Sequence, residues 1–190
     1  MSMPVEIELN PVDFVTVGTV GPKGKRVFHL QAGKSDEIVT LTIEKEQAFA
    51  LGEAIRELLE DLDKRYPQKR TQFARAITTT MELREPIESK FRVAQMGLGY
   101  DEDRDMVVLV AQELITPARE TLDDDAESDD DFDEIESELE PESDDAPEPG
   151  IVRMWCSRDQ MRALSQQSMN TVQSGRPDPK LNGRLVYYWT

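Results

Sequence analysis

The order of apolar and polar side chains near the start of the chain predicts three short β-strands. The segments Phe14–Val20, Val27–Ala32 and Ile38–Ile43 are rich in β-branched residues, and the second and third alternate in polarity. The sequences between them, GPKGKR and GKSDE, are typical of turns. Connections this short join antiparallel neighbours, because parallel strands need a long crossover. We therefore expect an antiparallel three-stranded meander.

The period then changes to that of an amphipathic helix. Apolar residues recur every three or four positions, which places them on one helical face. Pro67 ends the pattern, because the residue before a proline avoids the helical region. From Gln68 to Ser89 the pattern is weak, and only Phe73 and Ile77 indicate a short helix. The main helical face consists of Ala48, Leu51, Ile55, Leu58 and Leu62.

Two further apolar segments predict a hairpin. Lys90–Tyr100 and Asp105–Leu114 flank the polar sequence DEDR. Because every residue from Met106 to Ala111 is apolar, we expect the second strand to be central and covered on both faces. In the first strand the apolar positions change parity near Val93–Ala94, which predicts a β-bulge there.

The last part of the chain predicts one more strand and one more helix. Ile151–Cys156 is the strand, and Ser157 and Gln160 have the spacing of a capping box at the start of the helix. Gly175 and Pro177 mark the end of that helix. The aromatic sequence RLVYYWT that follows is expected to dock on the domain or to add an edge strand.

The net charge of −17 comes from one segment. Glu120–Glu148 contains 17 acidic residues and no lysine or arginine, and the rest of the chain is neutral. This segment repels itself and has too few apolar residues to offset its conformational entropy. We expect residues 120–149 to form a disordered acidic linker, inserted into one domain of residues 1–119 and 150–190. The predicted fold class is α+β, with a mostly antiparallel sheet of five or six strands and two main helices packed on it.

Four stretches follow one another in a specific order. They are FVTVGTVGPKGKRVFHLQAG, IVTLTIEKEQAFALGEAIRELL, FRVAQMGLGYDEDRDMVVLVAQEL and VRMWCSRDQMRALSQQSMNTVQSGRP. In this order they resemble a bacterial family of uncharacterised proteins, domain of unknown function 3090. The sequences IEKEQ, which leads into the first helix, and MGLGYDEDRD, in the hairpin, are the most specific parts of the resemblance.

The resemblance also bears on metal binding. Relatives carry a C-terminal tail that contains cysteine and histidine, resembles a zinc-binding knuckle, and follows a sequence like Gly175–Pro177. After Pro177 this sequence has neither cysteine nor histidine. The zinc role therefore does not carry over, and we expect no structural zinc and no other metal site. The resemblance implies at most a phosphate-related pathway, and it implies no reaction.

Catalytic groups are few. Cys156 and His29 are the only thiol and the only imidazole, and a nucleophilic Cys–His pair is one arrangement that they could form. Cys156 shares strand parity with Val152 and Met154, which indicates a buried structural thiol instead. The sequence GPKGKR lacks the spacing of a phosphate-binding P-loop and leads into a strand, so it indicates a turn.

Two groups of charged residues are candidate binding sites. Lys25 and Arg26 would bind phosphate if the fold placed them in one pocket with Glu44 or Arg92, whereas a flat surface there would favour a protein partner. A basic patch near the end of the first helix would contact nucleic acid or would simply be a solvated helix end. The members of the patch are Lys64, Arg65, Lys69, Arg70 and Arg75.

We expect a non-catalytic interaction, adaptor or regulatory protein with another protein as its partner, because the usual catalytic groups, apart from acidic residues, are missing at usable spacing. One alternative is an enzyme or a nucleotide- or phosphate-binding protein of phosphate metabolism. The other is a nucleic-acid-binding protein inhibited by its own acidic segment, although nucleic acid is the less expected partner. No signal-peptide pattern and no membrane-length apolar run occur. We expect a cytoplasmic protein without a cofactor.

Overall fold

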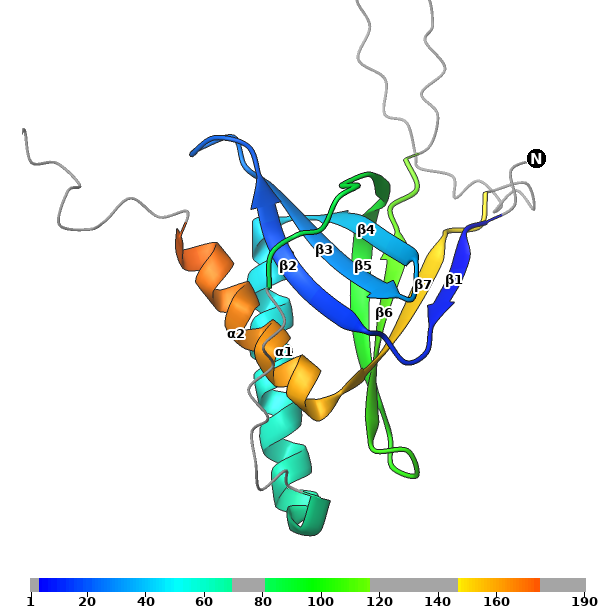
Figure 1. The fold of residues 1–190 in the computed structure, drawn as a ribbon, viewed down its shortest axis with the longest axis vertical. Helices are drawn as coiled ribbons and strands as arrows, with labels where there is room; N and C mark the ends of the chain where they lie inside the picture. Colours follow the sequence, from blue (N-terminus) through cyan, green and yellow to red (C-terminus); the bar gives the residue numbers. More distant parts are fainter. Residues whose placement is uncertain (1–3, 70–80, 117–146, 175–190) are drawn as a thin grey trace, which may run out of the picture.

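The computed structural model describes residues 4–69, 81–116 and 147–174. These residues form a mixed seven-stranded sheet with two long helices packed against it (Figure 1). The α+β fold class is therefore confirmed. The strand order across the sheet is β1-β7-β6-β5-β4-β3-β2. The bounds are β1 Glu6–Leu9, β2 Phe14–Val20, β3 Val27–Lys34, β4 Glu37–Ile43, α1 Lys45–Arg65, a 3-10 turn η1 at Pro67–Lys69, β5 Ser89–Asp101, β6 Met106–Glu113, β7 Ile151–Ser157 and α2 Arg158–Ser174.

The predicted meander is confirmed. β2 pairs antiparallel with β3 from Phe14 opposite Gly33 to Val20 opposite Val27. β3 then pairs antiparallel with β4. The short turns between these strands force this arrangement, as the sequence predicted.

The predicted number of strands and their directions need correction. The sheet has seven strands, and two neighbouring pairs, β1 with β7 and β4 with β5, are parallel. β1 has only four residues, too few for a recognisable pattern, although Ile7 and Leu9 face inward between exposed glutamates. β4 and β5 are parallel because α1 lies between them in sequence and carries the chain back across the sheet.

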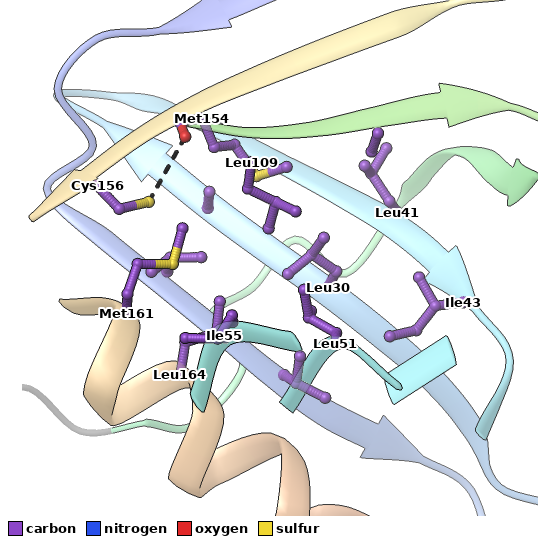
Figure 2. Packing of buried hydrophobic residues seen from close by; sticks show 14 of the residues in the cluster. Leu30, Leu41, Ile43, Leu51, Ile55, Leu109, Met154, Cys156, Met161 and Leu164 are labelled. Atoms are coloured by element: carbon purple, nitrogen blue, oxygen red, sulfur yellow. Dashed lines mark hydrogen bonds between the residues drawn. The ribbon is translucent and has the colours of Figure 1, made fainter. Parts of the chain in front are cut away.

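The apolar core fills the space between the curved sheet and the helices. Side chains from β3, β4, β6 and β7 converge with those of α1 and α2 (Figure 2). The strand that follows the acidic segment joins this same sheet between β1 and β6. Its side chains meet those of the meander inside one core. The largest fully buried side chains include Leu9, Leu30, Leu41, Ile55, Leu109, Met154, Met161 and Leu164.

The hairpin of β5 and β6 confirms the bulge and corrects one prediction. The register between the strands shifts between Val93 and Gln95, where the parity change predicted a bulge. β6 is central, but only one of its faces is buried: Val107 and Leu109 are inaccessible to solvent, whereas Val108 and Val110 are partly exposed. The prediction of two covered faces is therefore wrong, because both helices pack on the inner face of the sheet.

Reciprocal side-chain hydrogen bonds cap the start of α2. The Gln160 Oε1 accepts the Ser157 backbone N–H at 2.9 Å, and the Ser157 Oγ accepts the Gln160 N–H at 3.1 Å. This confirms the predicted capping box.

α1 and α2 lie side by side, and they approach closely at Gly52, whose carbonyl accepts a hydrogen bond from the Ser165 hydroxyl at 2.7 Å. A Cβ at this glycine would lie 3.1 Å from the Met169 Sδ.

Three predictions concern residues outside the described part of the chain. They are the short helix near Phe73 and Ile77, the disorder of the acidic linker, and the docking of the C-terminal RLVYYWT sequence. These remain predictions.

Candidate functional site

The structure places Arg26 and Lys45 at one shallow hollow. This hollow of about 230 Å³ is lined by Gly24, Arg26, Phe28 and Lys45, where the start of β3 meets the start of α1. The Arg26 Nη1 also donates to the backbone carbonyl of Ser174, the last residue of α2, at 3.5 Å. A cation at a helix C-terminus stabilises the helix dipole. Arg26 therefore has a structural contact in addition to its place in the hollow.

The other predicted phosphate ligands lie elsewhere on this surface. Glu44 and Arg92 form an ion pair with an N–O distance of 2.7 Å, and both side chains are more than half exposed. The parallel pairing of β4 and β5 sets this contact, because Thr42 lies opposite Arg92. Lys25 belongs to the exposed turn before β3 and does not line the hollow. The four residues are thus not gathered in one pocket.

Only part of the predicted basic patch falls within the described residues. Lys64 and Arg65 are exposed in the last turn of α1, and Arg65 pairs with Asp61 at 2.9 Å. The side chain of Lys69 and all of Arg70 and Arg75 lie outside the described part. A joint phosphate-binding role for the five residues remains a prediction.

Cys156 and His29 do not form a reactive pair. Cys156 is completely buried on the inner face of β7, where its Sγ lies 3.7 Å from the Met154 carbonyl oxygen (Figure 2). Desolvation raises the pKa of this thiol to about 12, so it is protonated at neutral pH. His29 neighbours inward-facing Leu30 in β3 and therefore points to the opposite face of the sheet. Desolvation lowers the pKa of His29, which a backbone hydrogen bond involving Leu41 partly offsets.

A buried arginine joins three elements at the hairpin end of the fold. Arg158, the first residue of α2, is only 3% exposed. Its Nε donates to the Asp105 carboxylate at 2.7 Å, its Nη2 donates to the Tyr100 hydroxyl at 2.9 Å, and its Nη1 lies 3.5 Å from the Asp63 carboxylate. The Tyr100 hydroxyl donates in turn to Asp105 at 2.6 Å. This cluster fixes the end of α1 and the hairpin against the start of α2.

The two outer edges of the sheet are protected. At β2, the Val17 carbonyl accepts hydrogen bonds from the Gln167 Nε2 at 3.1 Å and the Thr171 Oγ1 at 3.4 Å, both in α2. At the other edge, β1 is only four residues long and carries two glutamates. Short strands, charges and covering helices are the usual means of preventing unwanted strand pairing.

Part of β5 forms a third edge of the sheet, and this edge is less protected. β4 pairs with β5 only at Ser89 and Arg92, because β4 ends where α1 begins. From Gln95 to Tyr100, β5 pairs with β6 on one side, and no other described strand pairs with its second side. The sequence of this edge, QMGLGY, contains no charged residue. An uncharged strand edge of this length can take up another strand.

An apolar groove separates this edge from α1. The groove has a volume of about 330 Å³. Its helical wall consists of Gln47, Ala50, Leu51 and Ala54, and its other wall is the β5 segment Ala94–Leu98. At one end of the groove, the Gln47 Nε2 donates to the carbonyls of Val93 and Ala94, both at 3.1 Å. A strand edge facing a helix across an apolar groove is an arrangement that binds extended peptides in other domains.

A larger hollow lies elsewhere and is less informative. It has a volume of about 480 Å³ and lies between β2, the segment Met81–Ile87 and α2. The backbone of β2 is already bonded there to α2. Part of its lining, Met81–Leu83, directly follows in sequence residues 70–80, which the structure does not describe. Its shape therefore does not define a site.

Comparison with known proteins identifies the family. The model of DUF3090, described as a protein of unknown function, matches residues 7–184. The chain belongs to the DUF3090 family. This confirms the resemblance found in the sequence. No curated protein and no solved structure matches the chain.

Two features are absent from the described part of this DUF3090 chain. Within residues 4–69, 81–116 and 147–174, no three histidine, cysteine, aspartate or glutamate side chains gather as they would around a metal ion. None of the helices described is long and apolar enough to cross a membrane.

The groove in this DUF3090 chain was missed by sequence reasoning. Its helical wall consists partly of alanines, which look like ordinary helix formers in the sequence. Its strand wall falls in the MGLGY sequence, which the resemblance singled out without indicating a site. The free edge results from the place where β4 ends, and the parallel β4–β5 pairing was not predicted. Arg158 was missed for a similar reason, because an arginine in a first helical turn is usually exposed.

Proposed function

We propose that the chain is a non-catalytic interaction or adaptor module that takes up an extended segment of another protein in the groove between α1 and β5. The observation that carries this proposal is the contrast among strand edges. α2 covers β2 and glutamates flank β1, whereas the edge of β5 is uncharged and faces an apolar groove. A partner strand would satisfy the backbone groups of this edge that do not bond to β6.

The state of the few reactive groups supports a binding role. The single thiol is buried and protonated, and it lies on the opposite face of the sheet from the single imidazole. The ionisable groups with the densest contacts, Arg158, Asp105 and Tyr100, bond to one another within the fold. They hold the hairpin in place and leave the groove open to a partner.

A peptide-binding measurement tests this proposal. The full chain is immobilised and exposed to a random nonapeptide display library, and the affinities of enriched peptides are measured by fluorescence anisotropy. Ala54→Tyr fills the groove from an exposed helical position without adding charge. We expect it to abolish enrichment, whereas Gln166→Tyr, an exposed position on α2, is the matched control and should not. Enrichment that both variants retain equally would refute the groove as the binding site.

The second candidate function is binding of a phosphate-containing ligand at the hollow beside Arg26. Two cations, Arg26 and Lys45, and the aromatic ring of Phe28 line this hollow, which supports the candidate. The contact of Arg26 with Ser174 and the separation of Lys25, Glu44 and Arg92 make it the weaker one. Titration with inorganic phosphate and with ATP, followed by NMR, tests it. Shifts near Arg26 and Lys45 that vanish in an Arg26→Gln/Lys45→Gln variant would establish it.

The third possibility, a nucleic-acid-binding surface inhibited by the acidic segment, depends on residues outside the described part of the chain. Of its five basic residues, only Lys64 and Arg65 have described side chains. This possibility remains a prediction from the sequence alone.

A further inference from the structure

We propose that the partner segment is a basic, extended strand in which lysine or arginine residues flank one aliphatic side chain at two-residue intervals. This inference rests on the proposed function and specifies the chemistry of the partner at the same groove. It follows from the charges that border the groove and from the spacing between them.

The rim of the groove is acidic on its helical side. The wall positions Gln47, Ala50 and Ala54 follow helical spacing. Glu57 and Asp61 therefore lie on the same face of α1, about one and two turns beyond Ala54. Glu46 lies at the opposite end of the wall, in the first turn of α1. Both Glu46 and Glu57 are exposed, and neither forms an ion pair with another described residue. Asp61 already pairs with Arg65.

None of the β5 residues that line the groove is charged. β5 ends beyond the groove wall, in the acidic hairpin sequence Asp101–Asp103. At its other end, Arg92 is paired with Glu44, so its charge is already compensated. An uncharged apolar groove bordered by the exposed carboxylates of Glu46 and Glu57 favours a partner that combines apolar and basic side chains.

The spacing of Glu46 and Glu57 sets the pattern of the partner. Glu46 and Glu57 are 11 positions apart in α1, which corresponds to about 16 Å along the helix. In an extended strand, side chains at positions i and i+4 point the same way and lie about 13 Å apart. The long side chains of lysine and arginine span the difference. Basic residues at i and i+4 would then reach Glu46 and Glu57.

The side chain at position i+2 would point into the groove. It would lie midway between the two carboxylates, against Ala50 and Ala54 on α1 and opposite Met96 and Leu98 on β5. The groove volume of about 330 Å³ lies near the lower end of the usual range for ligand sites, about 300–1,000 Å³. A compact aliphatic residue such as valine or leucine suits this space. The expected pattern is therefore basic, any, aliphatic, any, basic.

Two designed peptides and one charge-reversed protein test this inference. The first nonapeptide has lysine at positions 3 and 7, valine at position 5 and threonine between them, and the second has glutamate in place of both lysines. We expect the full chain to bind the lysine peptide at least tenfold more tightly than the glutamate peptide. In a Glu46→Lys/Glu57→Lys variant this preference should reverse, because the rim charges are reversed. The control variant Asp36→Lys/Glu37→Lys reverses two exposed carboxylates at the turn between β3 and β4, which does not line the groove, and it should keep the original preference.

The outcomes separate this inference from the proposed function. If library peptides bind and Ala54→Tyr removes the binding, but the double reversal changes no preference, the groove binds peptides and the basic pattern is wrong. If Ala54→Tyr removes no binding, both proposals fail. If a synthetic peptide of residues 180–190 binds more tightly than any library peptide, the occupant is a segment of this chain, which overturns the inference. A dimer in sedimentation that Ala54→Tyr dissociates would overturn it in favour of a second copy.

Discussion

Gln47 links the start of α1 to the bulge of β5. Its Nε2 donates to the carbonyl of Val93 at 3.1 Å, and its Oε1 accepts the backbone N–H of Glu44 at 2.8 Å. The Gln47 side chain therefore caps α1 and also bonds to β5, at the point where β4 and β5 cease to pair. This contact lies at one end of the groove between α1 and β5.

Replacement of Gln47 by alanine should weaken both contacts. The helix loses half of its capping box, and the carbonyls of Val93 and Ala94 lose a donor. We expect the free energy of unfolding to fall by about 1–2 kcal/mol, which lowers the melting temperature by roughly 2–8 °C. Urea denaturation measures the change. Gln166→Ala, at an exposed position of α2, is the control, and an equal loss in both variants would contradict the role given to Gln47.

The Arg158 cluster should be sensitive to the loss of one partner. Arg158→Met leaves Asp105 half-buried without its cation and leaves the Tyr100 hydroxyl without its donor. Breaking a buried pair in this way costs about 3–5 kcal/mol of stability. The double variant Arg158→Met/Asp105→Leu should recover much of this loss, because no buried charge is left alone. Chemical denaturation measures the free energy of unfolding of both variants. An Arg158→Met variant as stable as the parent would contradict the structural role given to Arg158.

The buried thiol should make stability depend on alkaline pH. Burial raises the pKa of Cys156 from 9.0 to about 12. The folded state therefore keeps its proton to higher pH than the unfolded state. Its contribution is complete below pH 9.0 and is lost as the pH rises toward about 12, by about 1.4 kcal/mol per pH unit. Denaturation at a series of pH values should show a steeper decline in the parent chain than in Cys156→Ala, and equal slopes would contradict the burial.

The local patterns of the sequence were sufficient for most elements. Polarity alternation located the meander, the spacing of Ala48, Leu51 and Ile55 located α1, and the parity change near Val93 located the bulge. Each of these features depends on a few neighbouring residues. β1 was missed because four residues carry too little pattern, and its pairing with β7 joins segments far apart in the chain.

The candidate site depends on contacts that no local pattern encodes. The Glu44–Arg92 pair and the free edge of β5 both follow from the parallel register of β4 and β5. Arg158 is buried only because α1 and the hairpin approach the start of α2. The apolar sequence of β6 predicted that both of its faces are covered. Only one face is buried, because both helices pack on the inner face of the sheet.

Hydrogen exchange at the edge of β5 tests the central claim most directly. The backbone amides of Gln95–Gly99 that do not bond to β6 are followed in the free chain and with a saturating groove-binding peptide, and the amides of Val107–Ala111 in β6 are the internal reference. The account predicts fast exchange at the β5 edge in the free chain and strong protection when peptide is bound, because the peptide strand accepts these hydrogens. Exchange that is already as slow as in β6, or that stays fast when peptide is bound, would contradict it.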